Sequence, residues 1–506
     1  MTYDTVVIGS GASGMCTALA LARHGQRVAL VEQDDELAPL LRRFCRDGWW
    51  CDPGLHYVGG LSPSGPLAVI FRYLALDTLV EPLPLDRDAY DIVQVGDAEP
   101  IRFPVGPLRV QETLIRHYPR SERAIKAYLD AVQAVHRETP FLGFDHPASL
   151  LRSHMHTPTE SLATSLATYG AEEALQDMLS EYGFCLYGMH GDECPMMVHA
   201  MVLGSFFFSA HTFARGGDEV VDAFKRRINE AGAAIYSGQR ASRLVVDRHR
   251  RVCGVQLDGG GQLRCEACVC TVHPHRLAEL LPAQSIRKSF MTRVRWQENT
   301  PGLFTVYLGL DDTPKELGRS NRYFIDAPCE PAGARAIYVV PACGDGGNGL
   351  EPKSLAVISV QSAGSGVGKS MRGGCGAADA GVPTNHVGGA WARDKTYEYM
   401  KHRATEKTVE AFYLRFPELR GKCRVLDSAT PCTYESYTGT VGGSAYGMKQ
   451  SVAQAGLMAR TPLSGLYLAG QSVLAPGLLG VLISGLLAVS EILGAETVWE
   501  GLQKCR

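Results

Sequence analysis

The chain has 506 residues, of which 45% are hydrophobic and 20% are charged, and its formal net charge at pH 7 is −3. This length predicts two or more lobes around a large core, and the small net charge argues against a nucleic-acid-binding surface. The 15 cysteines are scattered and odd in number, which favours buried thiols over a disulfide framework. Because an apolar strand begins almost at the first residue, we expect no cleavable secretory signal and a cytoplasmic location.

The first thirty residues predict one β–α–β unit. Residues 6–8 form an apolar run that is too short for a helix and rich in β-branched side chains, as is typical of a buried parallel strand. Residues 15–24 are rich in Ala and Leu and indicate a helix that ends at Gly25. Residues 27–31 predict a second strand. A glycine-rich turn therefore joins the first strand to the helix.

The glycines of this turn have the G-x-G-x-x-G spacing of a dinucleotide-binding loop. Gly9 permits the tight turn, Gly11 lets the backbone approach a pyrophosphate, and Gly14 lets the helix pack closely on the strand. The helix N-terminus offers free N–H groups to the phosphates. Glu32, which ends the second strand, is placed to bind ribose hydroxyl groups and disfavours a 2′-phosphate. The residues predicted to bind the dinucleotide here are Gly9, Ser10, Gly11, Ala12, Ser13, Gly14, Glu32 and Gln33.

The next segment, residues 37–60, contains two candidate phosphate ligands and a motif. Arg42 and Arg43 could reach cofactor phosphates, although a solvated basic turn explains them equally well. The motif D-P-G-L-H-Y ends in His56 and Tyr57. A dinucleotide loop followed by this motif resembles the phytoene desaturase/retinol saturase branch of the FAD-dependent amine-oxidase-like superfamily, and G-L-H-Y resembles its saturase side. The resemblance implies that the dinucleotide is FAD.

The middle of the chain divides between the two predicted lobes. Helical patterns at residues 110–117 and 121–136 fit the largely helical substrate lobe that the resemblance implies. Residues 214–281 return to a glycine-led helix and a β-meander, in which the resemblance implies a backbone contact from Val245 to the adenine. Three cysteines at 265, 268 and 270 lack a second pair with zinc-site spacing, so we predict no metal site.

Residues 286–425 are predicted to return to the substrate lobe. Strands at 303–310 and 354–361 and a helix at 396–416 are indicated by their apolar patterns. Within the Gly-rich stretch at about 363–389, A-G-S-G-V-G-K-S fits a loose phosphate loop. The glycines that follow cannot propagate the helix that such a loop requires, so we interpret the stretch as an insertion.

The apolar segment 463–494 predicts a second flavin motif. Its length raises the alternative of a transmembrane helix, but interruptions by Gly and Pro favour a strand at 466–469, a loop and a helix from about residue 479. This arrangement resembles the closing motif of the superfamily. The resemblance implies that Gly470 and Gln471 meet the pyrophosphate or ribityl chain, although many relatives have an acid at the position of Gln471. It also implies that the helix N-terminus at Gly480 and Val481 points at the flavin pyrimidine edge.

We therefore predict an α/β fold, in which a Rossmann-type FAD-binding domain is built from discontinuous segments and accompanied by a mixed α+β substrate domain. The FAD-binding segments are predicted at residues 1–105, 212–285 and 426–506. The substrate segments are predicted at 106–211, which is largely helical, and at 286–425, which contains the insertion.

The resemblance implies an oxidoreductase that exchanges hydride between flavin N5 and a C=C or CH–CH unit of a lipophilic, isoprenoid-like or polyene-like substrate. It favours reduction over desaturation. The candidate catalytic residues are His56 and Tyr57, with Tyr434 and Tyr437 behind them; the alternative for each is a buried polar residue whose hydrogen bonds are satisfied.

Several alternatives stay open at this point. They are a flavin-dependent double-bond isomerase, an amine oxidase and a non-catalytic protein with an FAD fold. No second dinucleotide motif identifies an electron donor or acceptor. A lipophilic substrate is compatible with a weak peripheral membrane contact, but we see no basic amphipathic helix to make it and predict no integral membrane segment.

Overall fold

The computed structural model describes residues 2–145, 160–282, 284–311, 317–325, 334–343, 352–361, 386–387, 390–391, 395–454 and 456–506. The phosphate-loop-like sequence at 363–370, and nearly all of the predicted insertion, lie outside these residues.

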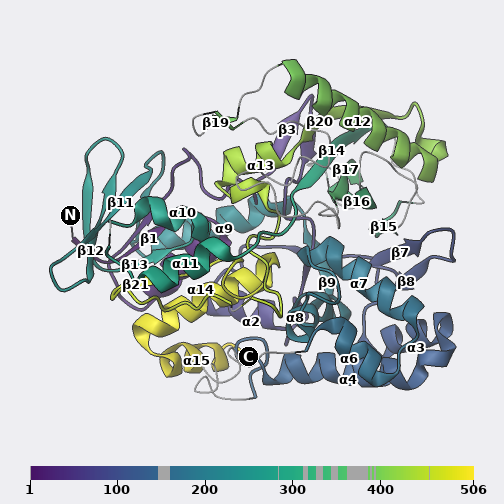
Figure 1. The fold of residues 1–506 in the computed structure, drawn as a ribbon, viewed down its shortest axis with the longest axis horizontal. Coiled ribbons are helices and arrows are strands. Elements are labelled where there is room, and N and C mark those ends of the chain that lie inside the picture. The colour runs from purple at the N-terminus through teal and green to yellow at the C-terminus, as the bar shows by residue number, and fades with distance from the viewer. Residues whose placement is uncertain are drawn as a thin grey trace.

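A largely parallel sheet forms one lobe, at the left of Figure 1. Its central strand β1 is parallel to both of its neighbours, and the sheet combines chain segments that are more than 200 residues apart in sequence. This arrangement confirms the predicted α/β fold class with a Rossmann-type domain. Its described strands run in the order β10 (Ala234–Tyr236), β2 (Val28–Val31), β1 (Thr2–Ile8), β13 (Gln262–Cys270), β12 (Val252–Leu257) and β11 (Ala241–Val246), with β21 (Leu466–Leu468) also paired to β13.

Helices cover both faces of this sheet, which explains why its central strands are apolar throughout. Val7 and Leu30 belong to a large core cluster that includes side chains of α1 (Ala12–Arg23), α9 (Gly216–Glu230) and α14 (Gly477–Leu493). Val6 and Ile8 belong to a second cluster, which includes side chains of α10 (Pro274–Leu280) and α11 (Lys288–Trp296).

A second sheet lies at the upper right of Figure 1, with α12 (Lys395–Arg415) packed against it. Two of its strands, β7 and β8, come from the predicted segment 1–105. Their buried apolar side chains pack on the helical layer of the substrate lobe, which explains why these two strands belong to the second sheet. The described strands run in the order β20 (Cys423–Ala429), β14 (Leu303–Leu310), β17 (Pro352–Gln361), β16 (Ala334–Cys343), β15 (Asn321–Ile325), β7 (Asp91–Val95) and β8 (Ile101–Phe103).

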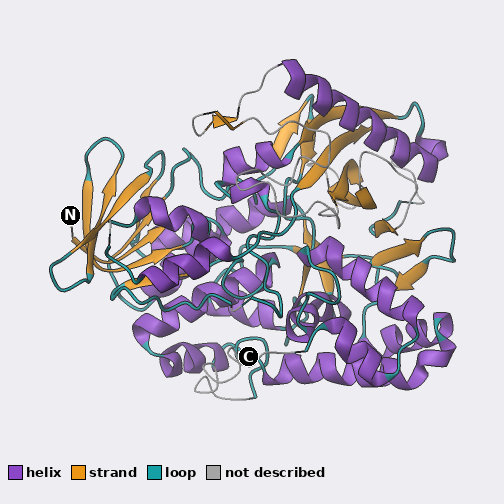
Figure 2. Cartoon of the chain, viewed as in Figure 1, coloured by secondary structure: helices purple, strands orange, loops and turns teal. Residues whose placement is uncertain are grey.

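A helical layer fills the lower right of the molecule, as Figure 2 shows. Its helices are α3 (Pro107–His117), α4 (Glu122–Glu138), α6 (Leu162–Tyr169), α7 (Glu173–Tyr187) and α8 (Met196–Phe208). The boundaries of the predicted domains stay predictions. The remaining described strands and α-helices are β3 (Phe44–Arg46), β4 (Trp49–Cys51), β5 (Val58–Gly59), α2 (Pro66–Tyr73), β6 (Pro82–Pro84), β9 (Ala210–Phe213), β18 (His386–Val387), β19 (Ala390–Trp391), α13 (Pro431–Thr438) and α15 (Ala495–Gln503).

Candidate active site

The carboxyl ends of four parallel strands open into a cavity of about 730 Å³. This is the edge of an open α/β sheet at which ligands bind. The loop after each of these strands contributes to the wall, so most of the lining is backbone or small side chains. The lining residues that directly follow β1, β2, β13 and β21 are Gly9–Ser13, Glu32 and Gln33, Thr271 and Val272, and Gly470 and Gln471.

The three glycines of the first loop are needed for different reasons. Gly9 has a φ of +96°, and a Cβ there would meet the hydroxyl of Thr271. A Cβ on Gly14 would overlap the carbonyl oxygen of Gly9. Gly11 has nothing within 4 Å of the position of its Cβ and faces open space. The fold therefore requires Gly9 and Gly14, whereas only a ligand in the cavity would require Gly11.

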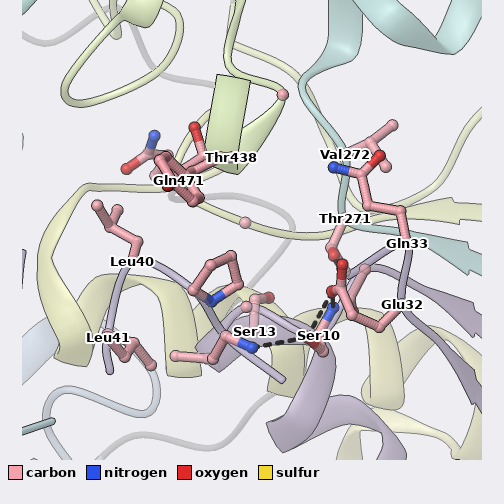
Figure 3. Close-up of a pocket in the computed structure, with 18 of the residues that line it drawn as sticks. Ser10, Ser13, Glu32, Gln33, Leu40, Leu41, Thr271, Val272, Thr438 and Gln471 are labelled. Carbon is pink, nitrogen blue, oxygen red and sulfur yellow. Dashed lines mark hydrogen bonds between the residues drawn. The ribbon is translucent and has the colours of Figure 1, made fainter. Parts of the chain in front are cut away.

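Glu32 is held rigidly at the end of β2. Its carboxylate accepts hydrogen bonds from the backbone N–H of Ser10 (2.8 Å), from the Ser10 hydroxyl and from the N–H of Asp34 (3.1 Å). Figure 3 shows Glu32 and Ser10 together, with Leu40 and Leu41 on the opposite side of the cavity. The side chain is only 6% exposed, and it lines the cavity where a ribose would lie.

The far end of the cavity is formed by the C-terminal segment. Gly470, Gln471 and Val481 line it, together with Gly477 and Leu478 at the start of α14. No side chain caps this helix, so the N–H groups of its first turn are free to meet a ligand. Gly480 does not line the described cavity.

A Cβ at Gly480 would meet the carbonyl oxygen of Ala475, so this glycine serves the packing of the helix on its own loop. The helix start that faces the cavity is thus Gly477, three residues before the predicted position.

Three predicted cofactor ligands lie elsewhere. Arg42 pairs with Glu36, and Arg43 pairs with Asp218 (2.9 Å). Neither arginine is among the residues described as lining the cavity, and neither is Val245. The β-meander contributes residues 239–241 instead, because they precede β11 at the edge that faces the cavity.

Sequence reasoning missed a charged bridge across the cavity. Arg276 of α10 donates to Glu435 of α13 (2.8 Å) and to Glu279 (3.0 Å), and all three line the cavity. Arg276 and Glu435 are 159 residues apart in sequence. No local motif could therefore have indicated the pair. At this part of the cavity wall, the positive charge of Arg276 is thus balanced by two carboxylates.

The four catalytic candidates belong to different surroundings. The Tyr57 hydroxyl donates to Asp91 (2.8 Å), and its ring stacks on Phe206 at 4.4 Å. Burial lowers the pKa of His56 to about 4, so its imidazole is neutral at pH 7. Tyr434 hydrogen-bonds Thr305 (2.7 Å), whereas Tyr437 lines the cavity and is 59% exposed.

Comparison with known proteins identifies the cofactor. The sequence profile of the flavin containing amine oxidoreductase family matches residues 12–342. The chain belongs to this family. It is an FAD-dependent oxidoreductase, and FAD is its cofactor. The glycine loop, the buried Glu32 and the uncapped α14 suit the pyrophosphate, ribose and flavin of that group.

Two curated proteins and one solved structure show what the chain is similar to. All-trans-retinol 13,14-reductase of Rattus norvegicus is 26% identical over 97% of this chain and 85% of that protein. All-trans-zeta-carotene desaturase of Myxococcus xanthus is 25% identical over 62% of this chain and 61% of that protein. The solved structure of an oxidoreductase from Methanosarcina mazei has a TM-score of 0.66 at 16% identity, covering 97% of this chain and 100% of that chain, which supports the fold.

Two features are absent from the described residues. Within that part of the chain, no three His, Cys, Asp or Glu side chains are grouped so that they could hold a metal ion. None of its helices has the length and apolar character needed to cross a bilayer, and this includes α14.

Proposed function

We propose that this flavoenzyme reduces a carbon–carbon double bond in a lipophilic, conjugated substrate of isoprenoid type. The observation that carries the proposal is the similarity to a retinol 13,14-reductase along nearly the whole chain, including the G-L-H-Y segment next to the cavity. The cavity has room for a dinucleotide, and Tyr446, Leu55 and Leu478 give part of its wall an aromatic and apolar character. Such walls suit a polyene.

The protein's share of the chemistry begins with holding FAD, which supplies and accepts hydride when bound. Glu32 would accept the ribose hydroxyls, and the loop from Gly9 to Gly14 would hold the pyrophosphate. The free N–H groups at the start of α14 would stabilise the negative charge of the reduced flavin pyrimidine edge. Gly470 and Gln471 would contact the chain between these two ends.

Reduction also requires a proton at the second carbon. His56 is neutral at pH 7 and is a poor acid there, because burial disfavours its charged form. Tyr57 carries a hydroxyl proton at every physiological pH, since burial and the neighbouring Asp91 hold its pKa well above the usual value. Of the predicted candidates, we therefore assign to Tyr57 the role of donating the proton to the second carbon. Tyr434 and Tyr437 would border the substrate.

The reverse reaction, desaturation, is the second candidate, because a carotene desaturase is among the relatives. Direction depends on the electron partner, which we leave open. The test is anaerobic: the FAD-loaded protein is reduced with light and mixed with conjugated polyenes and enones while the oxidised flavin band is followed. Return of the band with a polyene supports reduction. Bleaching of the oxidised protein by a partly saturated analogue, with no return from any polyene, supports desaturation.

Control reactions separate the remaining activities. Double-bond rearrangement without a donor or acceptor would identify an isomerase, and bleaching by alkyl amines alone would identify an amine oxidase. A purified protein that takes up no FAD would contradict the whole proposal. Heat-denatured protein with free FAD is the matched blank, because light-reduced free flavin can itself reduce reactive enones.

We further propose that α11 makes a peripheral contact with anionic membranes. Contrary to the expectation from sequence, α11 and its N-terminal flank form a basic helix with one apolar side packed on the core. Residues 284–297 contain no acid. Four exposed cations there have no ion pair with a described residue, and Trp296 is 79% exposed. The cations are Arg287, Lys288, Arg293 and Arg295.

Cations near an anionic bilayer contribute about 1 kcal/mol each, and Trp prefers the interface. We expect co-sedimentation with vesicles that contain phosphatidylglycerol, loss of binding at high salt, and no binding to phosphatidylcholine alone. R293E with R295E should weaken binding at least about tenfold. Arg226→Glu, which removes an exposed cation from α9, is the matched control. Equal binding by both variants would refute the assignment to α11.

A further inference from the structure

Asp91 is a fully buried carboxylate without a cationic partner. It begins β7, is 0% exposed, and accepts hydrogen bonds from Asn321 (2.7 Å), Tyr57 (2.8 Å) and Tyr182. No Lys, Arg or His contacts it in the described part of the chain. Buried carboxylates are normally paired with a cation, because burial disfavours the charge. The hydrogen bonds to the Asp91 carboxyl group therefore come from three neutral donors.

The groups that face Asp91 come from every element around it. They are Tyr57 from the segment before β5, Tyr182 from α7, Asn321 and Tyr323 from β15, and Tyr90 on its own segment. All are neutral. Burial raises the pKa of Asp91 to about 6, while the hydrogen bonds from Tyr182, Asn321 and Tyr57 act in the opposite direction. Near neutral pH both forms of the carboxyl are therefore populated.

An aromatic wall connects Asp91 with the cofactor cavity. Tyr446 lines the cavity and hydrogen-bonds Tyr338, whose ring stacks on Tyr323 at 5.2 Å. The Tyr323 hydroxyl is in turn 2.8 Å from that of Tyr57. On the other side Leu55, two residues before Tyr57, also lines the cavity. Tyr57 is not among the residues that line the cavity; its side chain is half-buried, and this row of tyrosines joins it to the cavity wall.

Charge decides which form of Asp91 lets Tyr57 act as an acid. If Asp91 is ionised, loss of the Tyr57 proton would leave two adjacent negative charges in a buried site, which is strongly unfavourable. If Asp91 is protonated, its proton can move to the Tyr57 oxygen as Tyr57 gives up its own. One charge then results, on a carboxylate that Tyr182 and Asn321 already stabilise.

We propose that Asp91 stores the proton for double-bond reduction and delivers it through Tyr57. This inference rests on the proposed reductase function. In the step, hydride from reduced FAD forms a C–H bond at one carbon, and the π electrons take the Tyr57 proton at the other. Tyr57 recovers a proton from Asp91, and water then reprotonates the carboxylate. Asp91 does not touch the substrate, so it is a positioning residue and Tyr57 is the catalytic one.

The kinetic test follows single-turnover reoxidation of the light-reduced, FAD-loaded enzyme by the polyene identified above. We expect the rate to fall above about pH 6, up to about tenfold per pH unit. Tyr182→Phe removes a donor that stabilises the carboxylate, so the midpoint should move to higher pH. Tyr128→Phe, a buried tyrosine that bonds His199 instead, is the control and should leave the midpoint unchanged. An unchanged midpoint in Y182F would overturn the proposal.

A second readout needs no substrate. Infrared difference spectra of the FAD-loaded protein should contain a carboxylic-acid C=O band that titrates with the kinetic midpoint and is missing in Asp91→Asn. If no polyene reoxidises the flavin but this band titrates, the proposed function fails while the proton store stands. If the wild type lacks the band, or D91N keeps the wild-type pH profile, the role of Asp91 is refuted.

Discussion

Glu32 and Asp91 are both buried carboxylates at one end of a β-strand, but their donors come from different distances along the chain. Two of the donors to Glu32 lie on Ser10, 22 residues away, and the third lies two residues away. The donors to Asp91 lie 34, 91 and 230 residues away. The first carboxylate belongs to a local motif that is open to a ligand. The second is enclosed by side chains that only the complete fold brings together.

The first loop of the cavity depends on its glycines, whereas the surroundings of Asp91 depend on side chains from distant segments. A glycine in the first loop should then be more sensitive to substitution than a polar side chain near Asp91. The predictions that follow test this contrast, from the largest expected effect to the smallest.

Gly14→Ala should have the largest effect, because its Cβ would overlap the Gly9 carbonyl oxygen. We expect a loss of stability of roughly 1–3 kcal/mol or more and almost no bound FAD. Gly11→Ala has open space at its Cβ, so it should fold normally and lose only FAD affinity. The measurements are the flavin absorbance per protein and the melting temperature of each variant.

Gly261→Ala, in a turn where a Cβ meets only ordinary contacts, is the control for handling and expression. Stoichiometric FAD in Gly14→Ala would contradict the close packing of helix and strand. Normal FAD affinity in Gly11→Ala would mean that no pyrophosphate approaches this backbone.

Asp52 is a third buried carboxylate. Because it lacks a full set of hydrogen bonds, we expect it to make the stability of the fold depend on pH. Its Oδ1 has no hydrogen-bond partner among the described residues. Burial raises the pKa of Asp52 to about 7, opposed by Arg43 and assisted by Asp218. The folded-state pKa exceeds that of the unfolded chain. The stabilisation is therefore complete below about pH 4 and is lost as the pH rises through about 7.

The loss attributable to Asp52 over this range is at most about 4 kcal/mol. Asp52→Asn should remove it, so that urea unfolding gives similar free energies at about pH 5 and about pH 8 once the slope of the remaining groups is subtracted. Asp88→Asn, at an exposed acid paired with Arg109, is the control that should keep the wild-type slope. A D52N variant with the full slope would assign the pH dependence to other groups.

Tyr128→Phe should affect only stability, because neither Tyr128 nor its partner His199 is among the residues that line the cavity. His199 is bonded at both ring nitrogens, to Tyr128 (2.7 Å) and Tyr187 (2.9 Å), and burial lowers its pKa to about 3. Removing one partner leaves a buried nitrogen unsatisfied and should cost about 1–3 kcal/mol by urea unfolding. Bound FAD should not change. Tyr399→Phe, at a residue that is 65% exposed, should be neutral in both assays.

Local sequence patterns explain which parts could be predicted. The first strand, helix and second strand follow from residues 6–31, and β14 was predicted at its observed bounds. Glu32 could be predicted as a ribose ligand because that prediction depends on a fixed spacing from the glycines. Arg276 and Glu435, by contrast, meet only because α10 and α13 face each other across the cavity.

The same limit applies to Asp91 and to α11. Asp91 follows an ordinary loop, and nothing near it in sequence indicates three hydroxyl and amide donors from distant segments. The sequence of α11 contains several basic residues, but the exposure of their side chains depends on which side of the helix packs on the sheet. Arg42 and Arg43 illustrate the same limit, since the sequence places two cations next to a phosphate motif but does not indicate their ion pairs with Glu36 and Asp218.

Glu32→Gln should have the smallest effect and is the sharpest test of the contrast between the two carboxylates. The amide can still accept from the Ser10 N–H, so the fold should hold. Hydrogen bonds to a charged group are stronger than those to a neutral one, and we expect FAD affinity to fall about tenfold. Glu36→Gln, four residues away on the surface and paired with Arg42, is the matched control. Because Glu32 is only 6% exposed yet borders the cavity, unchanged affinity would mean that its carboxylate serves Ser10 and the loop alone. In that case Glu32 and Asp91 would both be internal structural acids, and the ribose would have to bind the backbone instead.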